Sequence, residues 1–292
     1  MNDIGTEMAK AAAETAVKEG SNKFSNVMGV IFPFFGLKRK GVEVYLAEIE
    51  NSNLSPEMKM MTIANTKKTY KELKNQNAIA KIAIEYAKDG TDFSEASAVD
   101  DEWLARFMDS AKFVSTEQMQ VVWGRVLAGE FEKPGTVPPQ MIRVLSEIPL
   151  HYAKIFSTLC NLTSTISLPM GEAKVSFEAL FVEHTRGFYQ SLGIKFQSLS
   201  ELQNLGLIKF DPSSGFINKI SKEQYPMFNL TYGNEAITIA DYPNMSFPVG
   251  EVLLTDVGRS LSRIVEKSTV EGHLAAVKAY LTENNVIISE QS

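Results

Sequence analysis

A long amphipathic pattern in residues 56–88 constrains the fold more than any other feature. Ser55, Pro56 and Glu57 form a typical helix start: serine accepts hydrogen bonds from free backbone amides, proline fits the first turn, and an acid favours the positive end of the helix dipole. Apolar residues then recur at intervals of three and four or their sums, which predicts one amphipathic helix ending near Lys88. The apolar positions are Met60, Ile63, Tyr70, Leu73, Ile79, Ile82 and Tyr86.

Lysine dominates the polar side of this pattern, at Lys67, Lys68, Lys71, Lys74, Lys81 and Lys88. The lysines are interpreted either as a solvated helix face or as a patch for phosphate or anionic lipid. Residues 89–99 are interpreted as a linker. They do not form a calcium loop of the EF-hand type. Phe93 stands at the fifth loop position, which needs an oxygen ligand, and Asp100 stands at the twelfth, where glutamate is required.

Shorter helices are expected on both sides of the long one. Asp100 or Asp101 caps the next helix, Ser115 and Gln118 form a capping box for another that ends near Gly129, and proline pairs or single prolines begin two more. The expected segments are residues 5–19, 42–49, 101–108, 116–129, 139–145 and 149–159.

The pattern changes after Leu162. Residues 163–168 are rich in β-branched residues and predict a strand, and Gly233-Asn234 is a hairpin signal between strands 227–232 and 236–240. A further strand is expected at 249–254, and helices are expected at 176–192, 199–205, 259–267 and 273–283. The predicted fold is mainly α: an N-terminal helical array followed by an α+β winged-helix-like domain.

Composition limits the class of protein. The chain has 292 residues, of which 44% are hydrophobic and 22% charged, and its net charge is −6. This suggests about two globular domains, and the acidic balance argues against nucleic acid as a partner. The expected parts are an N-terminal apolar segment (1–41), a helical domain (42–162) and a winged-helix-like α+β domain (163–292).

The segment 24–40 is unusually apolar and ends in three cations. Glycine and proline interrupt it, so a kinked or broken helix is expected. It is interpreted as ordinary core, as a contact with another copy of the chain, or as a membrane element that is held back until a signal frees it. The candidate contact residues are Val30, Ile31, Phe32, Phe34, Phe35, Leu37, Lys38, Arg39 and Lys40.

No catalytic or metal-binding set is found in the sequence. The histidines His151, His184 and His273 are widely separated, and the single cysteine, Cys160, has the apolar helical neighbours of a core thiol. No phosphate-binding loop, dinucleotide fingerprint or nucleophile elbow is present in the sequence. The sequence therefore predicts a protein that is not an enzyme and needs no cofactor.

Residues 100–159 resemble a block found in bacterial proteins of this size, often encoded in prophages or mobile islands, and more distantly the abortive-infection alpha (Abi-alpha) family. The shared order is a helix with Asp101 and Trp103, a helix with Trp123 and Leu127, a proline-bounded turn, and a helix around Leu145. Pro149 departs from the usual serine there. The resemblance implies a role in cell–phage conflict and carries no catalytic residues.

Residues 198–265 resemble the outline of a winged-helix module. A helix ending at Leu205-Gly206 is followed by a hairpin and then by the run Leu254 to Ile264. A winged helix that recognises DNA needs cations on its recognition helix and wing, whereas Glu201 and Glu235 stand in these places. The region is therefore expected to serve as a scaffold or a protein-binding surface.

The resemblance to the abortive-infection family, taken with the apolar segment 24–40, implies an anti-phage protein of the abortive-infection type. It would sense a phage component, expected to be a phage protein, and release segment 24–40 onto anionic lipid of the inner membrane as a homo-oligomer. With no signal-like N-terminus and no run of about 20 apolar residues, its expected location is cytoplasmic and conditionally peripheral to that membrane. The alternative is a cytoplasmic adaptor or nucleic-acid-binding regulator that uses the winged-helix-like region.

Overall fold

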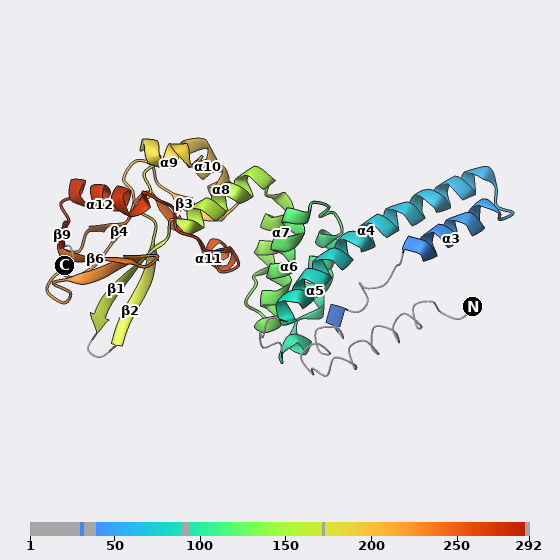
Figure 1. The fold of residues 1–292 in the computed structure, drawn as a ribbon, viewed down its shortest axis with the longest axis horizontal. Coiled ribbons are helices and arrows are strands. Elements are labelled where there is room, and N and C mark those ends of the chain that lie inside the picture. Colours follow the sequence, from blue (N-terminus) through green and yellow to red (C-terminus); the bar gives the residue numbers. More distant parts are fainter. Residues whose placement is uncertain (1–29, 32–38, 89–93, 171–172, 290–292) are drawn as a thin grey trace. The chain divides into compact units, whose positions relative to one another are not determined.

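The computed structural model describes residues 30–31, 39–88, 94–170 and 173–289 (Figure 1). The chain divides into two compact units, Met1–Ser146 and Glu147–Ser292. Helices make up the described part of the first unit, and the second contains small antiparallel sheets, so the coarse fold class is confirmed. The predicted helix 5–19 lies outside the described residues.

Two helices open the described part of the first unit. Helix α3 (Arg39–Glu50) lies alongside the N-terminal half of α4 (Pro56–Lys88) in Figure 1. The Met58 amide donates to Ser55 Oγ at 3.3 Å, which confirms the predicted cap. Both predicted segments are therefore helical, and the chain reverses between them to form a helical hairpin.

Three further helices complete this unit: α5 (Asp101–Ala111), α6 (Glu117–Glu132) and α7 (Pro139–Glu147), with a short 3₁₀ turn η2 (Ala96–Ala98) before them. Asp100 caps α5 by accepting from the Trp103 amide at 2.7 Å, as predicted. The predicted capping box on α6 is wrong. Thr116 is the N-cap residue and makes no side-chain cap bond.

Helix α6 also continues past Gly129 to Glu132, and it ends where Lys133 leaves the helical conformation (φ −144°, ψ 88°) just before Pro134. The buried carboxylate of Glu130 closes the following turn. One of its oxygens accepts from the Gly135 amide at 2.6 Å and the other from the Val137 amide at 2.8 Å. This carboxylate therefore satisfies backbone amides that would otherwise lack partners.

The core of the first unit forms where α4 crosses α6. A Cβ atom on Gly124 would lie 2.4 Å from Ile82 Cγ2, so the two helices approach more closely than an alanine would allow. Aromatic rings of α5 and α6 fill the adjoining space: Phe107 stacks on Trp103 at 5.0 Å and meets Trp123 at 4.9 Å between ring centroids. All three rings are buried.

The second unit begins with α8 (Leu150–Asn161), which packs against α10 (Phe196–Asn204). Hydrogen bonds tie the end of α8 to a distant loop: Asn161 Nδ2 donates to Ser268 Oγ at 2.9 Å, and Lys267 Nζ donates to the Cys160 carbonyl at 3.1 Å. The division between units therefore falls before α8, earlier than the expected boundary at 162/163.

The main sheet has the strand order β2-β1-β5-β6-β9 and is antiparallel throughout. Its strands are β1 (Ser164–Met170), β2 (Ala173–Ala179), β5 (Phe228–Tyr232), β6 (Glu235–Asp241) and β9 (Ile287–Ser289). Pairing of Tyr232 with Glu235 across Gly233 confirms the predicted hairpin. The hairpin belongs to this sheet, where Leu230 pairs with Ile166 of β1.

The predicted helix 176–192 is wrong. Apolar residues Val175 and Phe177 alternate with polar neighbours, which suits an antiparallel strand, and β2 pairs with β1 over its whole length. Only α9 (Gly187–Ser191) is helical in this interval. The pairing partner β1 decides the conformation here.

Two smaller strand pairs accompany the sheet: β3 (Ile208–Phe210) with β8 (Val252–Leu254), and β4 (Ile217–Asn218) with β7 (Phe247–Pro248). The strand predicted at 249–254 is therefore shorter than expected. Gly250 (φ 87°) interrupts it where the backbone passes the Leu180 carbonyl so closely that a Cβ would lie 2.3 Å from the oxygen.

Two more helices close the second unit. Helix α11 (Asp256–Ser262) is capped by Thr255 Oγ1, which accepts from the Gly258 amide at 3.0 Å, and it is shorter than the predicted 259–267. Helix α12 (His273–Glu283) follows Gly272 as predicted. Its Leu274, Val277 and Leu281 enter the buried cluster formed with the strands of the main sheet.

Candidate functional site

The structure describes only part of the predicted contact segment. Phe32, Phe34, Phe35, Leu37 and Lys38 lie outside the described residues. Ile31 is buried and Val30 is half-buried, whereas Arg39 begins α3 and Lys40 is exposed. The described start of the segment is thus covered, and its described end is open to solvent.

The helical hairpin that follows the segment exposes apolar side chains. We call this set the hairpin surface: Val44, Tyr45, Leu54, Met58, Met60 and Met61. Met60 and Met61 are each 67% exposed. None of the described residues between 56 and 74 in α4 is buried, and burial begins at Asn75, where α4 meets the other helices. Half of α4 therefore carries no buried residue, and in Figure 1 this half extends beyond α5 and α6.

Positive charge follows the hairpin surface along α4, whereas α3 carries two cations and three glutamates. Helix α4 carries seven lysines and three glutamates, so its balance is cationic although the chain as a whole is acidic. Lys67, Lys71 and Lys74 are exposed, while Lys68 lies 4.0 Å from Glu72. A shallow cavity of about 260 Å³ beside Tyr70 and Leu73 also has Lys74 and Lys81 in its lining. Apolar and cationic groups thus share one helix.

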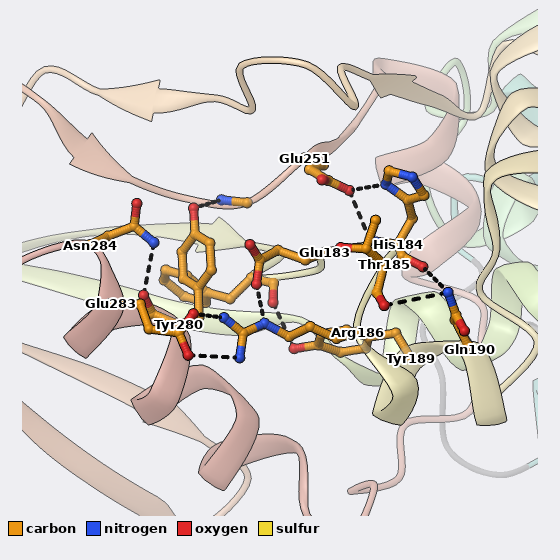
Figure 2. Close-up of polar contacts among 12 residues, drawn as sticks. Glu183, His184, Thr185, Arg186, Tyr189, Gln190, Glu251, Tyr280, Glu283 and Asn284 are labelled. Carbon is orange, nitrogen blue, oxygen red and sulfur yellow. Dashed lines mark hydrogen bonds and ion pairs between the residues drawn. The ribbon is translucent and has the colours of Figure 1, made fainter.

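A polar network occupies the second unit (Figure 2). Arg186 lies between two acids: it donates to Glu183, three residues away, and to Glu283 at the end of α12. Partial burial lowers the pKa of the Arg186 guanidinium, and the hydrogen bonds to both glutamates more than offset this, so its pKa is raised. The network ties the loop before α9 to the C-terminus of α12.

His184 and Glu251 form the most enzyme-like pair in this network. Glu251 Oε2 accepts hydrogen bonds from both His184 Nδ1 and the His184 amide, each at 2.8 Å. Figure 2 shows the pair, in which His184 belongs to the loop before α9 and Glu251 directly precedes β8. Phe196 and Phe210 meet the imidazole edge-on. Among the described residues no hydroxyl or thiol is hydrogen-bonded to the ring, so the pair holds the loop and lacks the nucleophile that general-base catalysis would activate.

Burial explains the other perturbed groups of the second unit. The pKa of the Cys160 thiol is raised to about 11, mainly because the thiol is buried, which makes it an unreactive core group. The pKa of His273 is lowered to about 4 by burial, opposed by the Leu162 carbonyl. Tyr189, whose hydroxyl donates to the Phe181 carbonyl at 2.6 Å, has a raised pKa because it too is buried.

Two kinds of feature are absent from the described ranges. In residues 30–31, 39–88, 94–170 and 173–289, no cluster of three histidine, cysteine, aspartate or glutamate side chains is placed to hold a metal ion. Within the same part of the chain, no helix has the length and apolar character needed to cross a membrane.

The sequence pattern indicated some of these features and missed others. It indicated the lysines of α4. It also assigned Met60 and Ile79 to one apolar stripe, although Met60 is 67% exposed and Ile79 is buried. It contained no sign of the pairing of His184 with Glu251, which lie 67 residues apart in the chain. Only the tertiary structure shows which half of α4 is covered.

Comparison with known proteins places the chain in a family. Residues 63–278 match the model of the family described as "Protein of unknown function (DUF2806)". Because the match covers more than half of the chain, the chain belongs to this family. The match begins within α4 and ends within α12, so α3 and segment 24–40 precede it. No curated protein and no solved structure matches the chain.

Proposed function

We propose that the protein acts in anti-phage defence of the abortive-infection type, as a homo-oligomer that binds the anionic inner membrane once a phage component is sensed. Its membrane element is segment 24–40 together with the helical hairpin of α3 and α4. The observation that carries this proposal is the hairpin surface, an uncovered apolar set on α3, α4 and the turn between them, together with the net positive charge of α4.

Energetic arguments support membrane binding by this element. Full burial of a methionine side chain is worth roughly 1.5–3 kcal/mol, and each lysine near an anionic surface adds about 1 kcal/mol. Met58, Met60 and Met61 with two or three lysines are therefore enough for reversible binding. Interfacial binding needs no helix that crosses the bilayer.

The described start of the segment supports a held-back state. Ile31 is buried and Val30 half-buried, so these apolar residues are already covered before any membrane is present. A trigger would then make Phe32, Phe34 and Phe35 available to the membrane interface, in addition to the hairpin surface, which is exposed beforehand. The three consecutive cations Lys38, Arg39 and Lys40 would contact anionic lipid headgroups at the membrane surface.

A vesicle flotation experiment tests the hairpin surface. The full chain is mixed with phosphatidylcholine vesicles that contain or lack phosphatidylserine. We expect flotation with the anionic vesicles only, weakened by salt because the attraction is partly electrostatic. M60E/M61E should abolish flotation, whereas the matched control M170E/M227E, which changes two exposed methionines of the second unit, should float like the wild type. Equal flotation of both double variants would contradict the role of the hairpin.

Cell fractionation during phage challenge tests the trigger. We expect the wild type to move to the membrane fraction and to protect, and F34E/F35E to do neither. Chemical cross-linking of the membrane fraction reports whether the bound form is an oligomer. Protection that persists while M60E/M61E and F34E/F35E both stay out of the membrane would refute the membrane mechanism but leave a defence role intact.

The second candidate function is that of a protein-binding adaptor, which would bind its partner through the winged-helix-like region. The succession α10, β3, β8 and α11 supports it, since α10 contacts β3, β3 pairs with β8, and Leu199, Leu202 and Leu261 are buried. The hairpin of β5 and β6 pairs with β1 and does not act as a free wing. Nucleic-acid binding through Lys219 and Lys222 is tested by an electrophoretic shift at low salt; Lys222 is paired with Asp241, and we expect no shift.

A further inference from the structure

A cavity of about 610 Å³ opens in the second unit between the outermost strand of the main sheet and the β3–β8 pair. Leu180, the residue after strand β2, forms an isolated antiparallel bridge with Val252 of β8. Continued pairing would place Glu178 opposite Leu254, but the strands separate there and both residues line the cavity. The cavity is thus a wedge whose narrow end is the bridge.

The narrow end is held firmly. The Glu251 amide donates to the Val182 carbonyl at 2.9 Å, and a side chain at Gly250 would collide with Leu180 and Val182. The wedge is therefore a permanent feature of the packing between the residues after β2 and those before β8. It does not depend on a mobile loop.

One wall of the wedge is a free strand edge. In the described sheet β2 pairs with β1 on one side and has no strand on the other. Ser176, Phe177 and Glu178 line the cavity from this wall. A free edge presents unpaired backbone donors and acceptors, which an extended chain can satisfy by adding a strand.

Another part of the lining is cationic. Lys209 of β3 and Arg263 after α11 line the cavity, and neither side chain forms an ion pair or hydrogen bond with any described residue. Arg259 also lines it but is engaged, because it donates to Asp256 and to the Leu254 carbonyl. The acids of the lining are Asp256, which is paired, and Glu178. Two unpaired cations thus favour an acidic partner.

The remaining lining is apolar. Phe177 and Leu253 are partly buried against the core cluster of the second unit and still reach the cavity. They offer a contact for apolar side chains of an added strand, in which successive residues point to opposite faces. A small anion alone would leave these contacts and the free backbone of β2 unused.

We propose that this wedge binds an extended, acidic peptide segment of a partner protein, which pairs with the free edge of β2 and places carboxylates against Lys209 and Arg263. Backbone pairing supplies affinity, and the two cations select acidic sequences. The site lies wholly in the second unit. The inference stands on its own and does not rest on the membrane function proposed above.

The test uses the full chain and a panel of labelled peptides of about eight residues, a usual strand length, in which glutamate alternates with valine, isoleucine, leucine or phenylalanine. Fluorescence polarisation is expected to show saturable binding of acidic peptides. Lysine counterparts should bind at least about tenfold more weakly, as should backbone N-methylated acidic peptides, because each loses one class of contact. Hydrogen exchange should slow at residues 174–178 on binding.

Charge variants localise the interaction. K209E and R263E should each weaken binding about tenfold, and K219E, which changes an exposed lysine outside the cavity, should bind like the wild type. Thermal melting checks that all three variants fold. The proposal is overturned if no acidic peptide of the panel binds better than its lysine counterpart, if K209E and R263E bind as the wild type does, or if exchange at β2 is unchanged.

Discussion

At the scale of single residues, His273 shows how burial sets a chemical property. The side chain is inaccessible to solvent, its ring meets Tyr232 edge-on at 4.6 Å, and its Nδ1 lies 3.4 Å from the Tyr189 hydroxyl. Nε2 has no hydrogen-bond partner within the described structure. A proton added to this ring would be buried without an opposing charge, so the neutral form is strongly favoured.

This residue should make the second unit sensitive to acid. The pKa falls from 6.5 in the unfolded chain to about 4 in the folded one, so stability is full above about pH 6.5 and is lost as pH falls towards 4. The loss attributable to His273 is expected to reach about 3 kcal/mol. Urea unfolding at several pH values, monitored through hydrogen exchange of the α12 amides, measures this loss of stability.

H273Q provides the control for this prediction. The variant should be less stable than the wild type at neutral pH, because glutamine does not reproduce the packing of the buried ring. Glutamine does not titrate, so only the wild type should lose stability as the pH falls, and the difference between the two proteins should shrink. A difference that stays constant from about pH 7 to pH 4 would mean that another group causes the acid sensitivity.

At the scale of elements, α6 contains two glycines with opposite roles. Gly124 lies at the crossing with α4, where an added Cβ would meet Ile82 Cγ2 at 2.4 Å and the Ile79 carbonyl at 3.2 Å. Around Gly129 no atom apart from its chain neighbours and the backbone of its own helix lies within 4 Å of the position that an added Cβ would take. The intrinsic preference of a helix for alanine is the same at both sites, about 1 kcal/mol, so only packing distinguishes them.

We therefore expect G124A and G129A to change stability in opposite directions. G124A should lower the free energy of unfolding of the first unit by about 1–3 kcal/mol, because overpacking outweighs helix propensity. G129A should raise it by up to about 1 kcal/mol. Denaturant unfolding followed by the fluorescence of Trp103 and Trp123, both in this unit, gives both values. A stabilised G124A would show that the helices separate easily.

Local signals predicted most helices and failed where pairing decides. Ser55 and Asp100 each mark a helix start that the structure confirms. Residues 176–192 were assigned to the wrong element because β2 is specified by its partner β1. Strands β4 and β9 are two and three residues long, too short to leave a periodic pattern. The hairpin surface was likewise not predictable, since tertiary packing alone decides which end of α4 is covered.

At the scale of the whole molecule, the division between the two units falls between Ser146 and Glu147, and this position can be tested. Helix α8 belongs with the second unit: Phe156 and Leu159 are buried, and Tyr232 of β5 donates to the Asn161 carbonyl at 2.9 Å. Each unit has a core of its own, which is the usual requirement for independent folding.

We expect a fragment of residues 147–292 to unfold cooperatively and a fragment of residues 163–292 to be unfolded or aggregated, because the second lacks α8 and uncovers the apolar side of α10. Circular dichroism during thermal melting and size-exclusion chromatography distinguish these outcomes. Cooperative unfolding of the shorter fragment would move the boundary to 162/163.

The half-covered state of α4 also has a mechanical consequence. At about 1.5 Å per residue, a helix of 33 residues is about 50 Å long, and its N-terminal half lies beyond the core. Such a helix is a lever with its fulcrum at Asn75 and Gln76, whose side-chain amides hold the carbonyls of Lys112 and Met108 at 2.8 Å. A tilt of about 10° at the fulcrum would carry Met58 through about 5 Å, so a small rearrangement among α5 and α6 becomes a large displacement of the hairpin.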